Sequence, residues 1–251
     1  MSDEAIPAAT LVVWRDSAPD EQGGPKILVV ERSAGMAFAG GAVVFPGGRV
    51  DPADRALAEA LGRPGEAGKI TAIRETIEET GVIAGLRGAI SPRAGRDIQE
   101  ALHKGADFAQ LLGERDLTPE LDALVQFARW MPGFKHPRKF DTLFYLVAAP
   151  HGDWPPNPQP GECESAEWAG PGELLDRIDR GEASAIFPTK RNLERLAQYP
   201  SFEDALADAG AHSLDTIIPW IEEIGGVRHV RIPDDRGYPV LSEPLATAFR
   251  A

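Results

Sequence analysis

Three glutamates at helical spacing constrain this chain more than any other feature of its sequence. In the segment Arg74–Val82, Glu75 is followed by Glu78 and Glu79, and residues three and four apart lie above one another on an α-helix. Like charges at this spacing destabilise a helix by about 0.2–0.5 kcal/mol per pair, so the cluster needs a compensating cation. Carboxylate oxygens suit Mg²⁺ or Mn²⁺. The spacing therefore predicts a helix that carries a divalent-metal site.

The rest of the chain alternates strand-like and helical patterns, which predicts a mixed α/β protein. β-Branched runs bounded by glycine and proline indicate strands, and apolar residues at a spacing of about 3.6 indicate helices. We expect the third strand to end in a tight turn at Gly47 and Gly48, and Gly81 to cap the second helix. The predicted strands cover residues 8–14, 27–30, 42–45, 124–130, 142–149 and 164–168, and the predicted helices cover 54–61, 66–80, 171–180 and 188–199.

Two segments stand outside this alternation. Residues 91–124 are rich in Ala, Leu, Glu and Lys at helical spacing, which predicts a helical insertion. Residues 202–251 include an amphipathic stretch from Leu214 to Ile224, and the sequence leaves their role open. We therefore expect one main domain over residues 1–201 and a C-terminal extension over 202–251, which suits a chain of 251 residues.

An acidic composition limits the partners of this chain. Its formal net charge is −13, and binding to nucleic acids and anionic membranes depends on basic surface, so we expect neither partner. The single cysteine, Cys163, excludes an intramolecular disulfide and a multi-cysteine zinc site. The acidic N-terminus lacks the basic and apolar regions of a signal peptide, and no apolar run approaches roughly 18 residues. These features predict a cytoplasmic protein and leave its oligomeric state open, a homodimer included.

The glutamate helix also fits a longer pattern. The signature of Nudix hydrolases is a Gly, five residues, a Glu, seven residues, and then Arg-Glu-aliphatic-x-Glu-Glu-x-Gly-aliphatic, and residues 74–82 resemble its second half. Seven residues separate Glu66 from Arg74, so Glu66 is the acid that the pattern demands, and Gly48 of Phe-Pro-Gly-Gly is the upstream glycine. The chain thus resembles the Nudix hydrolase family over about residues 8–200.

Two departures from the signature accompany this resemblance. Seventeen residues instead of five separate Gly48 from Glu66, so an added segment, residues 51–64, is expected to fold out between the glycine turn and the helix. Asp51 or Asp54 of that segment could approach the same space as Glu66. At the second departure, Thr76 replaces the usual aliphatic residue.

The resemblance implies a fold, a reaction and roles for individual residues. The fold would be an α/β/α sandwich with a central mixed sheet, and the reaction would be Mg²⁺- or Mn²⁺-dependent hydrolysis of a pyrophosphate bond in a nucleoside diphosphate derivative. Arg74 would orient Glu78. The general base would be a motif glutamate or an acid beside the late strand. The implied metal ligands are Glu75, Glu78, Glu79, Glu66 and the backbone at Gly47 or Gly48, and the candidate bases beside that strand are Glu162 and Glu164.

The expected substrate comes from a narrower resemblance within the family. The insertion and Phe-Pro-Gly-Gly-Arg-Val-Asp-Pro look like the branch that includes the coenzyme A diphosphatases. Gly41 fits the coenzyme A motif of other family members, whereas position 37 is alanine instead of arginine. Coenzyme A or an acyl derivative is the first expectation. The alternatives are ADP-ribose, NADH or a nucleotide sugar, and a non-catalytic nucleotide sensor. A basic loop either contacts the outer phosphates or is a solvated turn; its cations are Lys135, Arg138 and Lys139.

Overall fold

The computed structural model describes residues 5–17, 23–36, 39–133 and 139–248. Its centre is a seven-stranded mixed sheet, with the strand order β3-β2-β1-β8-β7, β4 paired to β1 and β9 paired to β2. The strands are β1 Ile6–Arg15, β2 Lys26–Arg32, β3 Val43–Val44, β4 Gly47–Arg49, β7 Val125–Trp130, β8 Phe140–Ala148 and β9 Cys163–Ala169. β1 and β8 run parallel, from the pair Ile6–Phe140 to the pair Trp14–Ala148. The other pairs in this sheet are antiparallel.

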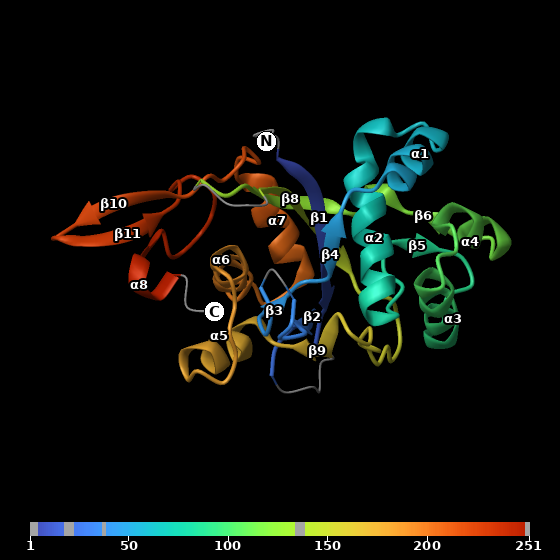
Figure 1. Ribbon diagram of the computed structural model, residues 1–251, viewed down its shortest axis with the longest axis horizontal. Helices are drawn as coiled ribbons and strands as arrows, with labels where there is room; N and C mark the ends of the chain where they lie inside the picture. Colours follow the sequence, from blue (N-terminus) through green and yellow to red (C-terminus); the bar gives the residue numbers. More distant parts are fainter. Residues whose placement is uncertain (1–4, 18–22, 37–38, 134–138, 249–251) are drawn as a thin grey trace.

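Helices cover both faces of the sheet, as Figure 1 shows. Alternation along β1 divides the core: Leu11 and Val13 pack into one hydrophobic cluster, and Val12 and Trp14 into the other. One face carries α1 Pro52–Ala60, α2 Ala67–Thr80, α3 Pro92–His103 and α4 Phe108–Glu114, and the other carries α5 Pro171–Asp179, α6 Phe187–Leu196 and α7 Phe202–Ala211. The expected α/β/α sandwich with a central mixed sheet is confirmed.

The predicted insertion, residues 91–124, is helical only in its first part. α3 and α4 occupy the residues up to Glu114. After them the short strand β6, Thr118–Pro119, pairs with β5, Leu86–Arg87, and a 3₁₀ turn covers Leu121–Ala123. Another 3₁₀ turn, Pro64–Glu66, leads into α2. The backbone at Gly47 and Gly48 also differs from the expected tight turn, because these residues form part of β4 and pair with Thr10 and Ala9 of β1.

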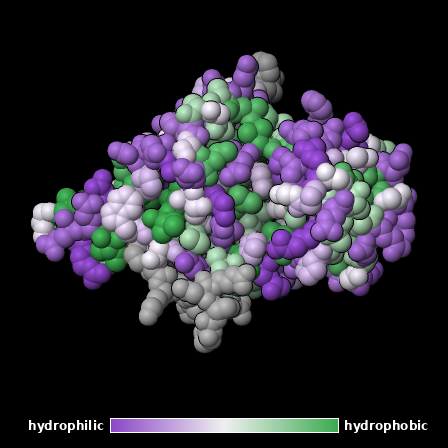
Figure 2. Space-filling model, turned by 90° about the horizontal axis from the view of Figure 1, so that it is seen from above, coloured by the Kyte–Doolittle hydropathy of each residue, from purple (hydrophilic) through white to green (hydrophobic). Residues whose placement is uncertain are grey.

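The C-terminal segment builds a second, smaller sheet. It consists of β10 Trp220–Ile224, β11 Val227–Arg231 and β12 Ser242–Pro244, followed by α8 Leu245–Ala248. The hairpin of β10 and β11 extends away from the sandwich (Figure 1). Apolar and polar side chains alternate over this end of the molecule in Figure 2, and Ile224 and Val227 at its tip are exposed. Among the described residues, no helix has both the length and the apolar character needed to cross a membrane.

Candidate active site

The predicted glutamate helix is α2, and the sheet holds it by its apolar face. Ile70, Ile73 and Ile77 recur at three- and four-residue intervals and are fully buried in the core beneath the sheet. The helix ends at Gly81, which adopts the left-handed conformation with φ of 68° and donates its N–H to the Ile77 carbonyl. This packing fixes the position of the motif glutamates relative to the strands.

The glycine strand β4 runs directly against these glutamates. A Cβ atom on Gly48 would lie 2.4 Å from the Glu75 carboxyl carbon, and one on Gly47 would lie 2.5 Å from the Ala9 carbonyl oxygen. The Gly47 N–H donates a 3.1 Å hydrogen bond to Glu79 Oε2. Glycine therefore suits both positions, because a side chain at Gly48 would meet the Glu75 carboxylate and one at Gly47 would meet the backbone of β1.

Arg74 links two of the three motif glutamates. Its Nη1 donates to Glu75 Oε1 at 3.0 Å and to Glu78 Oε2 at 2.9 Å. The contact with Glu78 is the one expected from the spacing of four residues. The guanidinium itself is buried, so its charge and its planar set of donors hold the two carboxylates more firmly than an exposed pair would.

Burial raises the pKa of all three motif glutamates. For Glu75 it raises the pKa to about 7; Arg74 opposes the shift and Glu78 adds to it. For Glu78 burial also raises the pKa, again opposed by Arg74. Glu79 is the most enclosed, and burial together with the Glu75 carboxylate raises its pKa well above the ordinary value, against the effect of the Gly47 N–H. These carboxylates lack sufficient positive charge around them.

The donor set suits a hard divalent cation. In the part of the chain that the structure describes, no three His, Cys, Asp or Glu side chains converge closely enough to hold a metal ion. Glu75 and Glu78 instead turn one oxygen each to Arg74, and Glu79 turns one to the Gly47 N–H. The residues nonetheless fit such an ion, because a bound cation would stabilise the charged form of carboxylates whose pKa values burial has raised.

The structure does not bring Glu66 to this cluster. Its carboxylate forms ion pairs with Arg63 at 2.7 Å and with Lys69 at 3.0 Å. It precedes α2, whereas Glu75 lies nine residues further on, about 13 Å along the helix axis at about 1.5 Å per residue. The motif spacing thus identifies a glutamate that pairs with two basic side chains at the start of the helix.

The two candidate bases differ in their surroundings. Glu162 is exposed, and its carboxylate raises the pKa of Glu79, which places it near the cluster. The loop before it follows the end of α2, because the Gln159 N–H donates to the Glu79 carbonyl at 3.1 Å. Glu164 is exposed at the bulge where the register of β9 against β2 shifts.

The predicted substrate loop is described only at its end. Lys135 and Arg138 lie outside the described residues. The Lys139 carbonyl accepts a hydrogen bond from the Ile6 N–H at 2.7 Å, directly before β8 begins.

Several residues around the glutamates were not assigned a role from the motif. Asp54 of α1 accepts two hydrogen bonds from Arg74, from Nε and from Nη2, both at 2.9 Å. On α3, Gln99 Nε2 donates to the Glu78 carbonyl, and His103 Nε2 lies 2.9 Å from the same oxygen. The acidic residues of the segment before α2 were a signal for Asp54, but no sequence pattern pointed to contacts between α3 and the glutamate helix.

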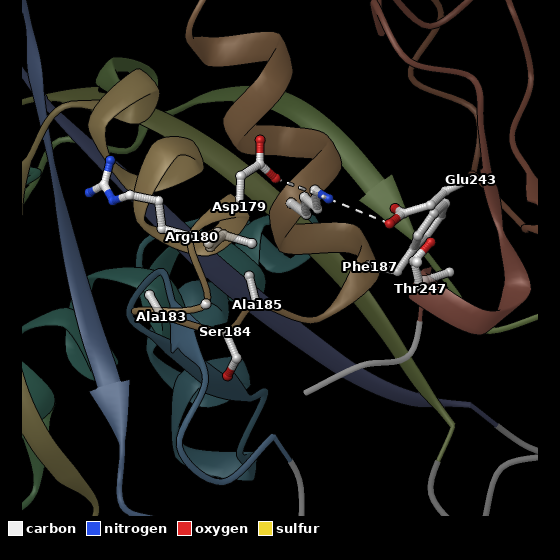
Figure 3. Close-up of a pocket in the computed structure, with 12 residues that line it drawn as sticks. Asp179, Arg180, Ala183, Ser184, Ala185, Phe187, Glu243 and Thr247 are labelled. Atoms are coloured by element: carbon white, nitrogen blue, oxygen red, sulfur yellow. Dashed lines mark hydrogen bonds and ion pairs between the residues drawn. The ribbon is translucent and has the colours of Figure 1, made fainter.

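A cavity of about 530 Å³ lies elsewhere, between α5, α6 and α8. Figure 3 shows Asp179 and Glu243 on opposite sides of it, and Lys190 Nζ lies 3.8 Å from Asp179 and 3.4 Å from Glu243. α5 and α6 cover the face of the sheet opposite α2 (Figure 1), and the motif glutamates are not among the residues that line the cavity. We therefore locate the candidate site at α2 and β4, where the carboxylates gather.

Comparison with known proteins finds relatives of this chain in one family. The family model of the NUDIX domain matches residues 7–189. The putative nudix hydrolase 7 of Caenorhabditis elegans is 27% identical over 71% of this chain, which spans only 58% of that protein. The acyl-coenzyme A diphosphatase NUDT19 of Homo sapiens is 26% identical over 88% of this chain and 74% of its own length.

A solved structure is also similar to this chain. The crystal structure of a NUDIX hydrolase from Alicyclobacillus acidocaldarius is 32% identical and superimposes with a TM-score of 0.68, over 81% of this chain and 96% of that one. The family model covers most of the sandwich, including α2 and β4. The chain therefore belongs to the Nudix hydrolase family.

Proposed function

We propose that this chain hydrolyses the pyrophosphate bond of a nucleoside diphosphate derivative with the help of Mg²⁺ or Mn²⁺. The observation that carries the proposal is the close approach of β4 to the glutamates of α2: a Cβ on Gly48 would meet the Glu75 carboxylate, and the Gly47 N–H donates to Glu79. Burial raises the pKa of all three glutamates. A pyrophosphate is itself anionic and the chain carries a net charge of −13, so attraction must come from a local cation and not from the overall field.

The proposed metal ligands are Glu75, Glu78 and Glu79, with the backbone at Gly48. When bound, the cation would neutralise charge on the phosphoryl oxygens and make hydroxide available near neutral pH. Arg74 keeps Glu75 and Glu78 in place through Nη1. The buried face of α2 keeps the helix fixed while the substrate binds.

Proton removal from the attacking water needs a base near the cluster. We assign this role to Glu162, because it is exposed and interacts electrostatically with Glu79. Water would add its oxygen to one phosphorus, the bond from that phosphorus to the bridging oxygen would break, and Glu162 would take the proton. Glu164 is the alternative base.

The proposed substrate class is coenzyme A or acyl-coenzyme A. The support is the resemblance to the human acyl-coenzyme A diphosphatase NUDT19 over 88% of this chain. Hydrolysis of coenzyme A would release 3′,5′-ADP and 4′-phosphopantetheine. Lys135, Arg138 and Lys139 would contact the outer phosphates. ADP-ribose, NADH and nucleotide sugars are the rival substrates for the same glutamates.

Turnover by the pure protein tests this function. The protein is incubated with Mg²⁺ or Mn²⁺ and, separately, with coenzyme A, acetyl-coenzyme A, ADP-ribose, NADH and a dinucleoside polyphosphate, and the products are separated by chromatography. We expect cleavage of coenzyme A or its acyl derivative at the pyrophosphate. Turnover of ADP-ribose alone would reassign the substrate, and no turnover of any compound would favour a nucleotide sensor.

The variant Glu78→Gln shows whether α2 carries the activity. We expect kcat to fall by about 100-fold or more, a loss comparable with that of other groups that stabilise transition-state charge. The melting temperature should change little, because burial already disfavours the charged form of Glu78. The matched control is Glu100→Gln on α3, where an exposed glutamate forms an ion pair with Lys104. Equal activity of the two variants would remove Glu78 from the site.

A further inference from the structure

The insertion between β4 and α2 places a buried carboxylate behind the motif arginine. Asp54 lies in the first turn of α1 and is only 1% exposed. Besides its two hydrogen bonds from Arg74, its Oδ2 accepts one from Thr71 Oγ1 at 2.8 Å and one from the Asp51 N–H at 3.0 Å. A buried carboxylate with four donors is held in one orientation, because any rotation would leave buried donors unpaired.

Arg74 uses its whole set of donors in this arrangement. Nε and Nη2 form a two-point contact with Asp54, and Nη2 also donates to the Arg49 carbonyl at 3.4 Å. Nη1 is left for Glu75 and Glu78. The planar guanidinium is thus fixed by Asp54 on one edge, and a single nitrogen faces the motif glutamates.

The fixed guanidinium contacts only one oxygen of each of its two glutamate partners. Nη1 contacts Oε1 of Glu75 and Oε2 of Glu78, so Arg74 engages one oxygen of each carboxylate and leaves the other oxygen to a different partner. Asp54 also balances the positive charge of Arg74. An arginine without Asp54 could rotate and take both oxygens of one glutamate, and its charge would oppose a cation nearby.

We propose that Asp54 is a positioning residue for the metal-binding carboxylates: it fixes Arg74 so that Glu75 and Glu78 keep an oxygen each for the cation. This rests on the proposed metal site. It assigns a role to one residue, Asp54, of the segment between Gly48 and Glu66. Glu66, paired with Arg63 and Lys69, does not supply that partner to Arg74.

Mn²⁺ affinity without substrate tests the proposal apart from turnover. Isothermal titration calorimetry would compare the unchanged chain with Asp54→Asn, whose amide nitrogen cannot accept the bonds that Asp54 accepts. We expect the dissociation constant for Mn²⁺ to rise about 10–100-fold, the usual range for loss of a partner that orients a metal ligand. In turnover, kcat should fall while KM stays close to that of the unchanged chain.

Asp208→Asn is the matched control on the opposite face of the sheet. Asp208 accepts hydrogen bonds from Nε and Nη2 of Arg195, at 2.8 and 2.6 Å, so its loss also breaks a buried arginine pair. We expect a similar fall in melting temperature and no change in Mn²⁺ affinity. Unchanged affinity in folded Asp54→Asn would overturn the proposal, as would a chain that binds no Mn²⁺ at all.

A double-mutant cycle asks whether Asp54 acts through Arg74. If it does, adding Asp54→Asn to Arg74→Gln should change Mn²⁺ affinity by less than about twofold relative to Arg74→Gln alone. A further loss of about tenfold or more would mean that Asp54 acts by another route. The double variant buries no unpaired charge, so it also decides the question if Asp54→Asn alone does not fold. A chain that binds Mn²⁺ but cleaves no substrate would refute the proposed hydrolysis and still permit this comparison.

Discussion

At the scale of single residues, Gly48 shows how little space the candidate site allows. Its Cα faces Glu75 so closely that an added methyl group would lie 2.4 Å from the carboxyl carbon and its Oε1. Glu75 cannot retreat freely, because Oε1 accepts a hydrogen bond from Arg74. A side chain at position 48 must therefore displace the carboxylate, the β4 backbone or both.

Gly48→Ala tests this constraint. We expect kcat to fall by about 100-fold, since a displacement of about 1 Å at a reacting site has effects of this size. The control is Gly113→Ala on α4, where an added Cβ meets nothing within 4 Å, and which should stabilise the helix by about 0.5–1 kcal/mol. Activity would be followed with the best substrate of the panel and stability by thermal unfolding. Full activity of Gly48→Ala would show that the glutamate adjusts without cost.

The sequence predicts some contacts of the site residues and does not predict others. Helical spacing alone predicted the contact between Arg74 and Glu78, because that geometry is local. The pairing of Asp54 with Arg74 depends on how the insertion folds back over twenty residues, which periodicity does not encode. Glu66 shows the reverse: its spacing from Arg74 fits the motif, but nearby Arg63 and Lys69 determine its contacts.

At the scale of elements, α6 buries charge on the face of the sheet opposite the site. Burial raises the pKa of Glu194 to about 7; Arg191 and Lys190 lower it, while Glu243 and Asp179 add to the rise. Burial also lowers the pKa of Arg191, whose Nη2 lies 2.7 Å from Glu194 Oε1. For both partners, the cost of burial exceeds the benefit of pairing.

This raised pKa predicts a pH dependence of stability. Between the ordinary pKa of 4.5 and about 7, the folded protein keeps a proton on Glu194 that the unfolded chain has lost. Stability from this group is therefore present below pH 4.5 and is lost as the pH rises towards 7. We expect Glu194→Gln to raise the free energy of unfolding in urea, relative to the unchanged chain, more at pH 7.5 than at pH 4.5. Exposed Glu182→Gln is the control, and a difference for Glu194→Gln that is the same at both pH values would contradict the assignment.

The elements that sequence predicted well are long and periodic. Periodicity placed α2 and the long strands β1 and β8 close to their observed bounds, because a run of apolar residues reports the face that is buried. β4 was mistaken for a turn, since glycine is rare in strands and its pairing with Ala9 and Thr10 is tertiary. β6 was predicted as part of a helical segment, because a strand of two residues is too short to show a periodic pattern.

At the scale of the whole molecule, the C-terminal segment shares a core with the sandwich. Ile217, Val230 and Tyr238 belong to the same hydrophobic cluster as Val12 and Trp14 of the central strand. The Trp130 indole N–H donates to the Tyr238 hydroxyl at 3.0 Å, and that hydroxyl donates to Asn192 Oδ1 at 2.7 Å. We propose that residues 202–251 and 1–201 unfold as one cooperative unit.

Tyr238→Phe tests this coupling. Loss of the hydroxyl leaves buried groups of Trp130 and Asn192 unpaired, so we expect the free energy of unfolding to fall by about 1–3 kcal/mol. The control is Val227→Ser at the exposed tip of the hairpin, which should change it by less than about 0.5 kcal/mol. Urea unfolding followed by tryptophan fluorescence measures both. Two separate transitions, or equal effects of the two variants, would show that the segment is independent of the sandwich.

The parallel pairing of β1 with β8 has a consequence for how the protein is made. Ile6 pairs with Phe140 and Trp14 with Ala148, so more than half of the chain separates the partners at the centre of the sheet. Contacts between such distant residues form slowly, because a long loop must close first. On the ribosome, β1 emerges long before β8 has been synthesised, and its apolar residues stay without their partner until then. Biosynthesis of this chain should therefore depend on chaperones that shield the nascent N-terminal strand.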